Sequence, residues 1–271
     1  MIHKLEILHR HLKRDYEKEL VINEDGTTDH VDCINHCLLF AFGECTQEHR
    51  TRCTMCDQLF TLIEYLAVIL PENFRTTIEE SQNKLYYFLA HQARKIHLNN
   101  QFKAKLLELD NDGAILVCDY KMRILPKSAR ETKEQFFGKR GWTLHSVLMY
   151  TKPDDGEQNY NITAYDHWSE DTKQDAWFTA SSLHAVFETL DPKPKWIKIF
   201  SDNGGHYHNS ELMTIIASWN QWYNIDVRGW HFFEPGEAKS TVDSHHAQVR
   251  RCYVNWLLMQ MKMLKLLRKA L

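Results

Sequence analysis

Two aspartates in this sequence each follow directly on a run of apolar residues. Asp119 comes after "ILVC", and Asp202 comes after "IKIFS". A carboxylate at the end of a central strand is costly to bury without a partner. Two such carboxylates held close together repel each other unless a cation lies between them, and hard oxygen ligands suit Mg²⁺ or Mn²⁺. The pattern therefore predicts a divalent-metal site, although a single Asp after a strand is more often a turn or cap residue.

A third acid would complete such a site, and the segment "FFEPGEAKSTVDSHHAQV" offers three. Asp243 is preferred over Glu237, and Glu237 over Glu234, because Asp243 follows a Ser-Thr pair at a predicted helix start. Three acids can hold two ions about 3.5–4 Å apart, an arrangement suited to phosphodiester chemistry. Lys239, in the same segment, is a candidate contact for a phosphate or the scissile region.

A second group of candidate ligands lies in the Cys/His segment "ECTQEHRTRCTMCDQLF". Its spacing, Cys45-x3-His49-x3-Cys53-x2-Cys56, ends in the C-x-x-C knuckle that tetrahedral Zn²⁺ favours. Thiolates and imidazoles select Zn²⁺ over Mg²⁺, and four ligands without a vacancy predict a structural site. Three nearby residues are candidates to replace one of these ligands: Cys33, His36 and Cys37. The alternatives are buried small thiols or a redox role.

Further residues are candidates for nucleic-acid contacts. Lys139, Arg140 and Trp142 lie in the segment "FFGKRGW", where two cations and an aromatic ring suit contact with DNA. His206 and His208 follow the Gly-Gly pair beyond the second aspartate. They could position a phosphate or assist proton transfer, although such histidines are more often polar loop residues.

Composition narrows the class of protein. The 271 residues are 43% hydrophobic and 25% charged, with a formal net charge of −3. These values are ordinary for a globular protein, and no apolar run reaches about 18 residues, so no membrane span is expected. The N-terminus is too charged for a signal peptide. Five cysteines within residues 33–56 then favour metal over disulfides in an intracellular protein.

The apolar pattern predicts the elements that carry these residues. A charged helix over 1–22 and two or three helices over 57–109 precede a turn at "DNDG". Three strands are expected next, at 114–120, 143–151 and 160–168. A helix at 175–190, a strand at 196–202, a helix at 210–223, a strand at 225–233 and a helix from 242 follow them. This order predicts an α/β fold with a mixed five-stranded sheet flanked by helices, which is the ribonuclease-H-like layout. The expected division is an α-helical zinc-binding module at 1–110, the core at 111–250 and a basic amphipathic helix at 251–271.

Three motifs together carry a family resemblance. "CDYK" with Asp119, "SDNGGHYHN" with Asp202 and "EPGEAKSTVDSHHA" with Asp243 resemble the catalytic core of DDE/DDD-type transposases of the ribonuclease-H-like superfamily. The sequence most resembles transposon-derived eukaryotic proteins that carry an upstream Cys/His zinc module. The resemblance covers residues from about 33 to 250. It implies integrase-like DNA strand cleavage and transfer that depends on Mg²⁺ or Mn²⁺. Asp119 and Asp202 would bridge the ions, and Asp243 would hold the second.

The resemblance also implies DNA as the partner and a nuclear location, and it leaves a homo-oligomer open. A structure-specific nuclease is a close variant. The alternative from another class is a domesticated, non-catalytic DNA-binding or interaction protein that keeps the fold and the zinc module. Retention of all three acids favours the enzyme, because packing does not require three like charges at one site.

Overall fold

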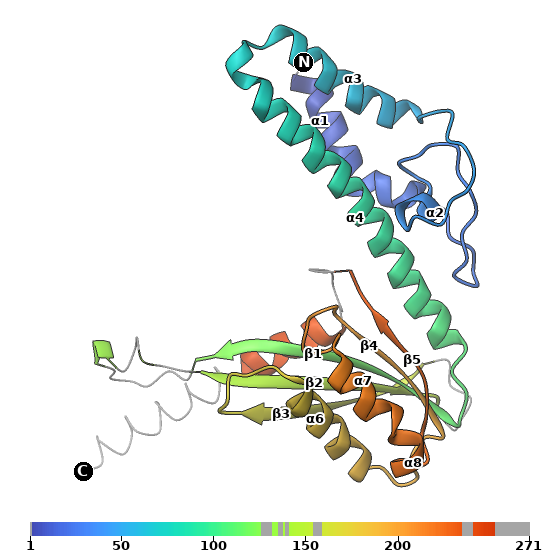
Figure 1. Ribbon diagram of the computed structural model, residues 1–271, viewed down its shortest axis with the longest axis vertical. Coiled ribbons are helices and arrows are strands. Elements are labelled where there is room, and N and C mark those ends of the chain that lie inside the picture. Colours follow the sequence, from blue (N-terminus) through green and yellow to red (C-terminus); the bar gives the residue numbers. More distant parts are fainter. Residues whose placement is uncertain are drawn as a thin grey trace. The chain divides into compact units, whose positions relative to one another are not determined.

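The computed structural model describes residues 2–125, 132–134, 138, 141–153, 159–234 and 241–252 (Figure 1). The chain divides into two compact units, Met1–Glu108 and Leu109–Leu271. The first is helical, and the second is built on a sheet. In the described part of the chain, no helix is both long enough and apolar enough to span a membrane.

The helical unit is built around two long helices. Its elements are α1 (Ile2–Arg10), η1 (His11–Asp15), η2 (Tyr16–Glu19), α2 (Leu38–Ala41), α3 (Thr54–Ile69), η3 (Glu72–Phe74) and α4 (Arg75–Leu107). Leu89, Ala93 and Ile96 recur at helical spacing along α4 and form the stripe that packs on the core of this unit. Phe60 of α3 stacks on Tyr86 of α4, with ring centroids 4.7 Å apart. The expected charged helix over 1–22 becomes α1 followed by two short irregular turns.

The second unit contains a mixed five-stranded sheet, as the sequence predicts. Its strands are β1 (Gly113–Ile124), β2 (Trp142–Thr151), β3 (Asn161–Ser169), β4 (Trp196–Ser201) and β5 (Asp226–Phe232). The strand order is β3-β2-β1-β4-β5. β1, β2 and β3 pair antiparallel, whereas β4 runs parallel to both β1 and β5. β1 is therefore the central strand.

Helices cover one face of this sheet, where the main core lies (Figure 1). They are α6 (Ala176–Glu188), α7 (Ser210–Ala217) and α8 (Trp219–Tyr223), so the helix expected over 210–223 is divided at Ser218. Alternate residues of β1 enter this core: Ala114, Leu116, Cys118 and Tyr120. Because successive side chains of a strand point to opposite faces, Asp119 belongs to the other face. A helix over the described residues 241–252 contacts that face through His246, which approaches Asp119.

Candidate metal centres

The first candidate centre starts from a row of polar residues across three strands. Asp119 of β1 is the register partner of Ser146 of β2, which is in turn the partner of Asp166 of β3. Register partners share a face of the sheet, so the three side chains form a polar row on the face opposite α6 and α7. The Ser146 hydroxyl donates to Asp166 Oδ1 at 2.5 Å. Two carboxylates therefore lie two strands apart with a hydroxyl between them.

The helix at 241–252 adds two ligands to this row. Asp243 and His246 are three residues apart and so share a helix face. One ligand atom from each lies within 4.8 Å of the others and of an Asp119 oxygen. His246 Nδ1 is 3.6 Å from Asp119 Oδ2, and the His246 residue is only 2% exposed. Burial lowers the pKa of His246, while the Asp119 charge opposes that shift. Two carboxylates and a neutral imidazole form a donor set that fits Mn²⁺ well and accepts Mg²⁺ through the oxygens.

A second histidine of the same helix contacts the far end of the row. His245 Nε2 lies 2.9 Å from Asp166 Oδ1 and 3.0 Å from Asp166 Oδ2. Sequence reasoning missed Asp166, Ser146 and both histidines as site residues. Two signals were available in the sequence: the acid within the strand segment "AYDHW", and the His pair close after Asp243.

Asp202 lies at the same level of the neighbouring strand. β1 and β4 pair in parallel up to Val117 and Phe200, and two further residues on each strand lead to Asp119 and Asp202. Neighbouring strands are about 4.8 Å apart, so the backbones at Asp119 and Asp202 lie close together. Asp202 does not belong to the group formed by Asp119 and the last helix.

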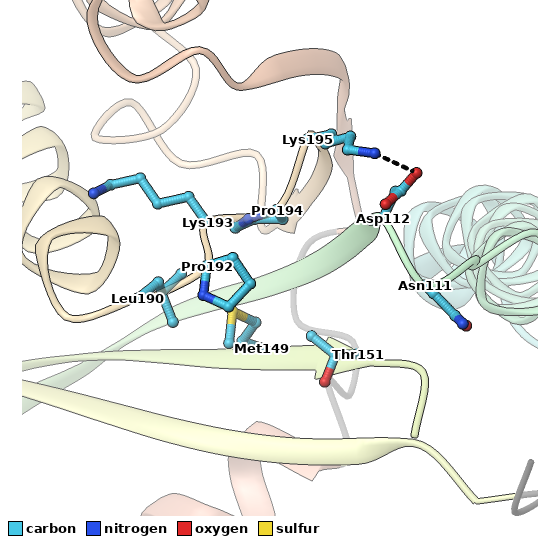
Figure 2. Close-up of a pocket in the computed structure, with 10 residues that line it drawn as sticks. Asn111, Asp112, Met149, Thr151, Leu190, Pro192, Lys193, Pro194 and Lys195 are labelled. Carbon is cyan, nitrogen blue, oxygen red and sulfur yellow. Dashed lines mark hydrogen bonds and ion pairs between the residues drawn. The ribbon is translucent and has the colours of Figure 1, made fainter. Parts of the chain in front are cut away.

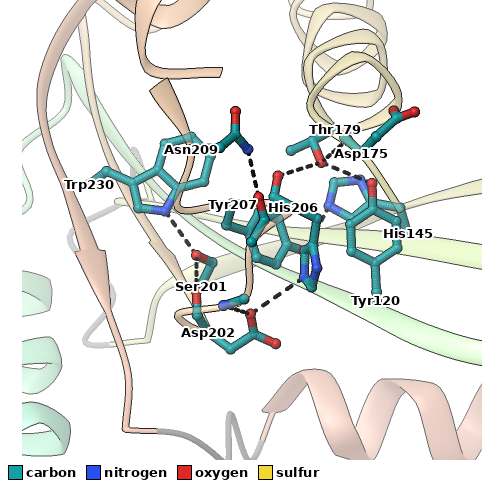
Figure 3. A network of polar contacts seen from close by, with 12 residues as sticks. Tyr120, His145, Asp175, Thr179, Ser201, Asp202, His206, Tyr207, Asn209 and Trp230 are labelled. Carbon is teal, nitrogen blue, oxygen red and sulfur yellow. Dashed lines mark hydrogen bonds and ion pairs between the residues drawn. The ribbon is translucent and has the colours of Figure 1, made fainter. Parts of the chain in front are cut away.

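The Asp202 carboxylate is instead held by its own loop, as Figure 3 shows. Asp202 Oδ1 accepts from the Gly204 backbone N–H at 2.8 Å and lies 3.4 Å from His206 Nε2. A Cβ on Gly204 would fall 2.5 Å from His206 Cε1, so only glycine allows this close approach. The second candidate histidine, His208, packs on the Phe232 ring at 4.7 Å instead of facing the carboxylates.

Buried polar contacts fix the frame around this loop (Figure 3). Trp230 Nε1 donates to the Ser201 hydroxyl at 2.8 Å, and that hydroxyl donates to the Asp202 carbonyl at 2.8 Å. The Tyr207 hydroxyl and His145 Nε2 are 3.0 Å apart. Burial raises the pKa of Tyr207 well above its ordinary value, and the nearby charges of Asp119 and Asp202 add to that shift. Both carboxylates therefore lie close to one fully buried phenol.

Eight of the Cys and His residues of the helical unit form two clusters, not one. Within each cluster, one ligand atom from every residue lies within 4.8 Å of the others. The first cluster consists of Cys33, His36, Cys53 and Cys56. The second consists of His30, Cys37, Cys45 and His49.

The expected set of four ligands is therefore divided between the clusters. Cys53 and Cys56 lie at the start of α3, where Cys53 Sγ accepts from the Cys56 backbone N–H. Cys45 and His49 belong to the preceding loop and cluster with His30 and Cys37 instead. Short spacing identified both pairs correctly as neighbours, but the folding of the loop decides which pairs share a site. His30 was missed because it lies outside the clustered motif.

The first cluster has the dimensions of a tetrahedral zinc site. Zn–S bonds of about 2.3 Å and Zn–N bonds of about 2.0 Å place sulfur and nitrogen about 3.5 Å apart in a tetrahedron. His36 Nδ1 lies 3.3 Å from Cys33 Sγ, 3.7 Å from Cys53 Sγ and 3.8 Å from Cys56 Sγ. The contact between the Cys33 and Cys56 thiols lowers the pKa of Cys33 and raises the pKa of Cys56. The Cys33 thiol therefore loses its proton readily, whereas the Cys56 thiol resists losing its own unless a cation is bound.

A family model described as "Domain of unknown function (DUF8701)" matches residues 99–270. The chain belongs to this family. The matched segment of this DUF8701 chain holds the carboxylates at 119, 166, 202 and 243, and the two Cys/His clusters lie before it. No curated protein matches the sequence.

Among solved structures, nine chains match, including one from the "Crystal structure of the Mos1 Strand Transfer Complex". The sequences are 13% identical, and the TM-score is 0.27. The match covers 61% of this DUF8701 chain and 52% of the other, so this chain spans about half the length of that relative.

Several predicted site residues are not among those that the structure describes. Glu237, Lys239, Lys139 and Arg140 lie outside the described residues, as does most of the basic segment expected at 251–271. Among the described candidates, Glu234 lies two residues beyond β5 and outside the Asp119 group. Trp142 begins β2, is 39% exposed and packs edge-to-face on Trp168 at 6.2 Å. An exposed aromatic ring therefore remains available for stacking.

A separate pocket of about 230 Å³ lies at the opposite end of the strands (Figure 2). Its lining includes Gly113, the first residue of β1, and Lys195, which precedes β4. Lys195 Nζ pairs with Asp112 Oδ2 at 3.0 Å across its rim. Since Asp119 and Asp202 mark the carboxyl-terminal parts of those same strands, the pocket does not contribute to the carboxylate site.

Proposed function

We propose that this protein is a divalent-metal-dependent DNA nuclease of the transposase or integrase type, with a ribonuclease-H-like core. One observation carries the proposal: Asp119 of the central strand lies within 4.8 Å of Asp243 and His246, with Asp202 on the adjacent strand end. The order β3-β2-β1-β4-β5, with its antiparallel and parallel halves, supports the choice of core.

The carboxylates would act through bound metal ions in this mechanism. Bound Mg²⁺ or Mn²⁺ ions would activate the attacking oxygen and stabilise the leaving oxygen of an in-line displacement. Asp119, Asp202 and Asp243 would together hold the ions. His246 would join Asp243 as a ligand from the same helix turn. His206 would orient Asp202 through the contact at 3.4 Å.

Asp166 and His245 would act beside the metal ligands. His245 approaches both oxygens of Asp166, so that carboxylate fixes the imidazole in place. A histidine held in this way at the edge of a metal site can position a phosphate or a water for attack. Lys139, Arg140 and Lys239 remain proposed contacts for the DNA backbone, with the Trp142 ring as a stacking surface.

Zn²⁺ is proposed as a structural cofactor of the helical unit. The cluster of three cysteines and His36 fits it in donor type and in spacing. The proposed partner is DNA, the proposed location is the nucleus, and a homo-oligomer is compatible with this activity. A non-catalytic DNA-binding relative is the second candidate, favoured by the engagement of the Asp202 carboxylate with Gly204 and His206.

The test is cleavage of labelled DNA in Mn²⁺ or Mg²⁺ by the full chain. Asp119→Asn and Asp202→Asn are each expected to lower the rate at least about 100-fold, because loss of residues that merely support metal ligands costs 10- to 100-fold. Asp226→Asn is the matched control, since Asp226 begins β5 at the opposite end of the sheet and pairs with Arg228. Cleavage that survives both site variants would refute the site. Metal-dependent DNA binding without cleavage would favour the second candidate.

A further inference from the structure

The four residues of the second Cys/His cluster are arranged as a complete ligand set. We propose that they bind a second structural zinc ion, so that residues 30–56 carry two zinc ions in interleaved sites. The ligands of this second site are His30, Cys37, Cys45 and His49. The inference is independent of the proposed nuclease activity.

Interatomic distances in the second cluster match those of a tetrahedral zinc site. Cys45 Sγ lies 3.2 Å from His30 Nδ1 and 3.9 Å from His49 Nε2, and Cys37 Sγ lies 4.0 Å from His30 Nδ1. These values bracket the separation of about 3.5 Å expected between sulfur and nitrogen on one zinc ion. Two thiolates and two imidazoles select zinc over magnesium or calcium. Four protein ligands leave no position for a substrate, so the site is structural.

Carboxylates behind the histidines supply a second and independent observation. His30 presents Nδ1 to the sulfurs, and its Nε2 lies 3.4 Å from Asp32 Oδ1. In the first cluster, His36 likewise presents Nδ1, and its Nε2 lies 3.0 Å from Glu19 Oε2. A carboxylate behind the second ring nitrogen is the usual support of a zinc-bound histidine, because it fixes the ring and raises its basicity.

The segment that carries these ligands has little regular secondary structure, so cross-links through zinc would help to order it. Residues 20–53, all described, contain only the short helix α2 and an isolated bridge between Cys33 and Thr51. A segment of this length without regular structure is uncommon in a compact unit unless something else orders it. Metal ligation provides that order, because the binding free energy becomes folding free energy.

The ligands alternate along the chain in a way that couples the two sites. The first site joins residues 33–36 to residues 53–56 and so closes the loop between them. Three of the second site's ligand positions, Cys37, Cys45 and His49, lie inside that loop, and His30 lies before it. The second zinc ion would therefore fasten the loop onto the chain that enters it.

The two sites differ in their burial, which predicts different consequences of their loss. Three ligands of the first site are buried, and His36 packs on the buried Tyr16 ring at 4.8 Å. In the second site, only Cys37 is buried. Removal of the second ion should therefore disorder the loop locally and leave the helices folded, whereas removal of the first should unfold the helical unit.

The test is the zinc content of the purified full chain, measured by mass spectrometry of the metal. The expected values are two zinc ions per chain in the wild type, one in Cys45→Ala and in His49→Ala, and two in the control Cys252→Ser. Far-UV circular dichroism should show retained helices in Cys45→Ala. Cobalt substitution provides a second readout: the thiolate charge-transfer band should fall from five sulfurs to three, because Cys37 loses its ion together with Cys45.

Two outcomes would overturn the inference. One zinc ion in the wild type and none in Cys45→Ala would indicate a single site built from Cys45, His49, Cys53 and Cys56. Equal zinc content in the wild type, Cys45→Ala and His49→Ala would exclude a role for the second cluster. Neither outcome depends on whether the protein cleaves DNA, so a failed nuclease assay leaves this measurement intact.

Discussion

Gly204 offers a direct test of how the Asp202 loop is held. A methyl group at this position would lie 2.5 Å from His206 Cε1 and 2.9 Å from Asp202 Oδ1. The His206 ring must retreat by about 0.9 Å before that contact becomes an ordinary one of 3.4 Å. Both clashing atoms are ends of side chains, so the fold can yield at a cost of about 1–2 kcal/mol, at the low end for overpacking.

The expected functional effect is larger than the effect on stability. Displacing by roughly 1 Å a residue that positions a metal ligand, as His206 positions Asp202, costs on the order of 100-fold in rate, because the reacting groups lose their alignment. Gly204→Ala should therefore lower Mn²⁺-dependent cleavage by about that factor and weaken Mn²⁺ binding. Urea denaturation followed by tryptophan fluorescence measures the stability change, and titration calorimetry measures metal binding.

Gly205 provides the matched control. A Cβ at Gly205 would meet no atom within 4 Å, so Gly205→Ala adds the same methyl group one residue away without a clash. Its stability should stay equal or rise by about 0.4–1 kcal/mol, because alanine restricts the unfolded chain. Equal effects of the two substitutions on metal binding and rate would refute the reasoning that Gly204 is required for the Asp202–His206 contact.

Three further predictions concern stability. Asn209→Ala should destabilise the sheet unit by about 1 kcal/mol in urea, because Asn209 Oδ1 caps α7 by accepting from the Leu212 N–H at 2.8 Å. Asn209→Asp keeps an acceptor and should cost less. Burial lowers the pKa values of His167 and His246. At low pH the unfolded chain therefore binds protons on these histidines that the folded chain does not bind. The free energy of unfolding should fall as the pH drops below about 6.5, by at most about 1.4 kcal/mol per pH unit for each residue. Tryptophan-monitored denaturation at pH 7.5 and 5.5 checks the sign, and a flat profile would contradict it. Finally, chelation with EDTA should reduce the far-UV helix signal and leave tryptophan fluorescence unchanged, since all eight tryptophans follow residue 108. A parallel loss of both signals would contradict a zinc-dependent helical unit.

The strands of the sheet unit were predictable because their signal is local. The apolar runs before Asp119 and Asp202 locate β1 and β4, and three strands in succession predict the antiparallel half. The turn at "DNDG" likewise marks the change from helical to sheet periodicity. A mixed five-stranded α/β sheet is confirmed on this basis.

The membership of the carboxylate site was only partly predictable. Asp166 lies 47 residues after Asp119 in the sequence, and only the register of β2 with β3 brings them into one row. His245 and His246 join that row because the last helix docks on the face opposite α6. The position of that helix depends on how whole surfaces pack, and the spacing of residues in the sequence carries no information about such packing.

The metal ligands of the helical unit were also only partly predictable from the sequence. The sequence by itself determined that Cys, His and Asp residues of metal-binding type are present and which of them are close neighbours, because C-x-x-C and one-turn spacings fix short distances. Only the tertiary structure decided that Cys53 shares a cluster with Cys33, and that Cys45 shares one with His30. The path of a loop between distant ligands is set by long-range contacts, and no local pattern encodes it.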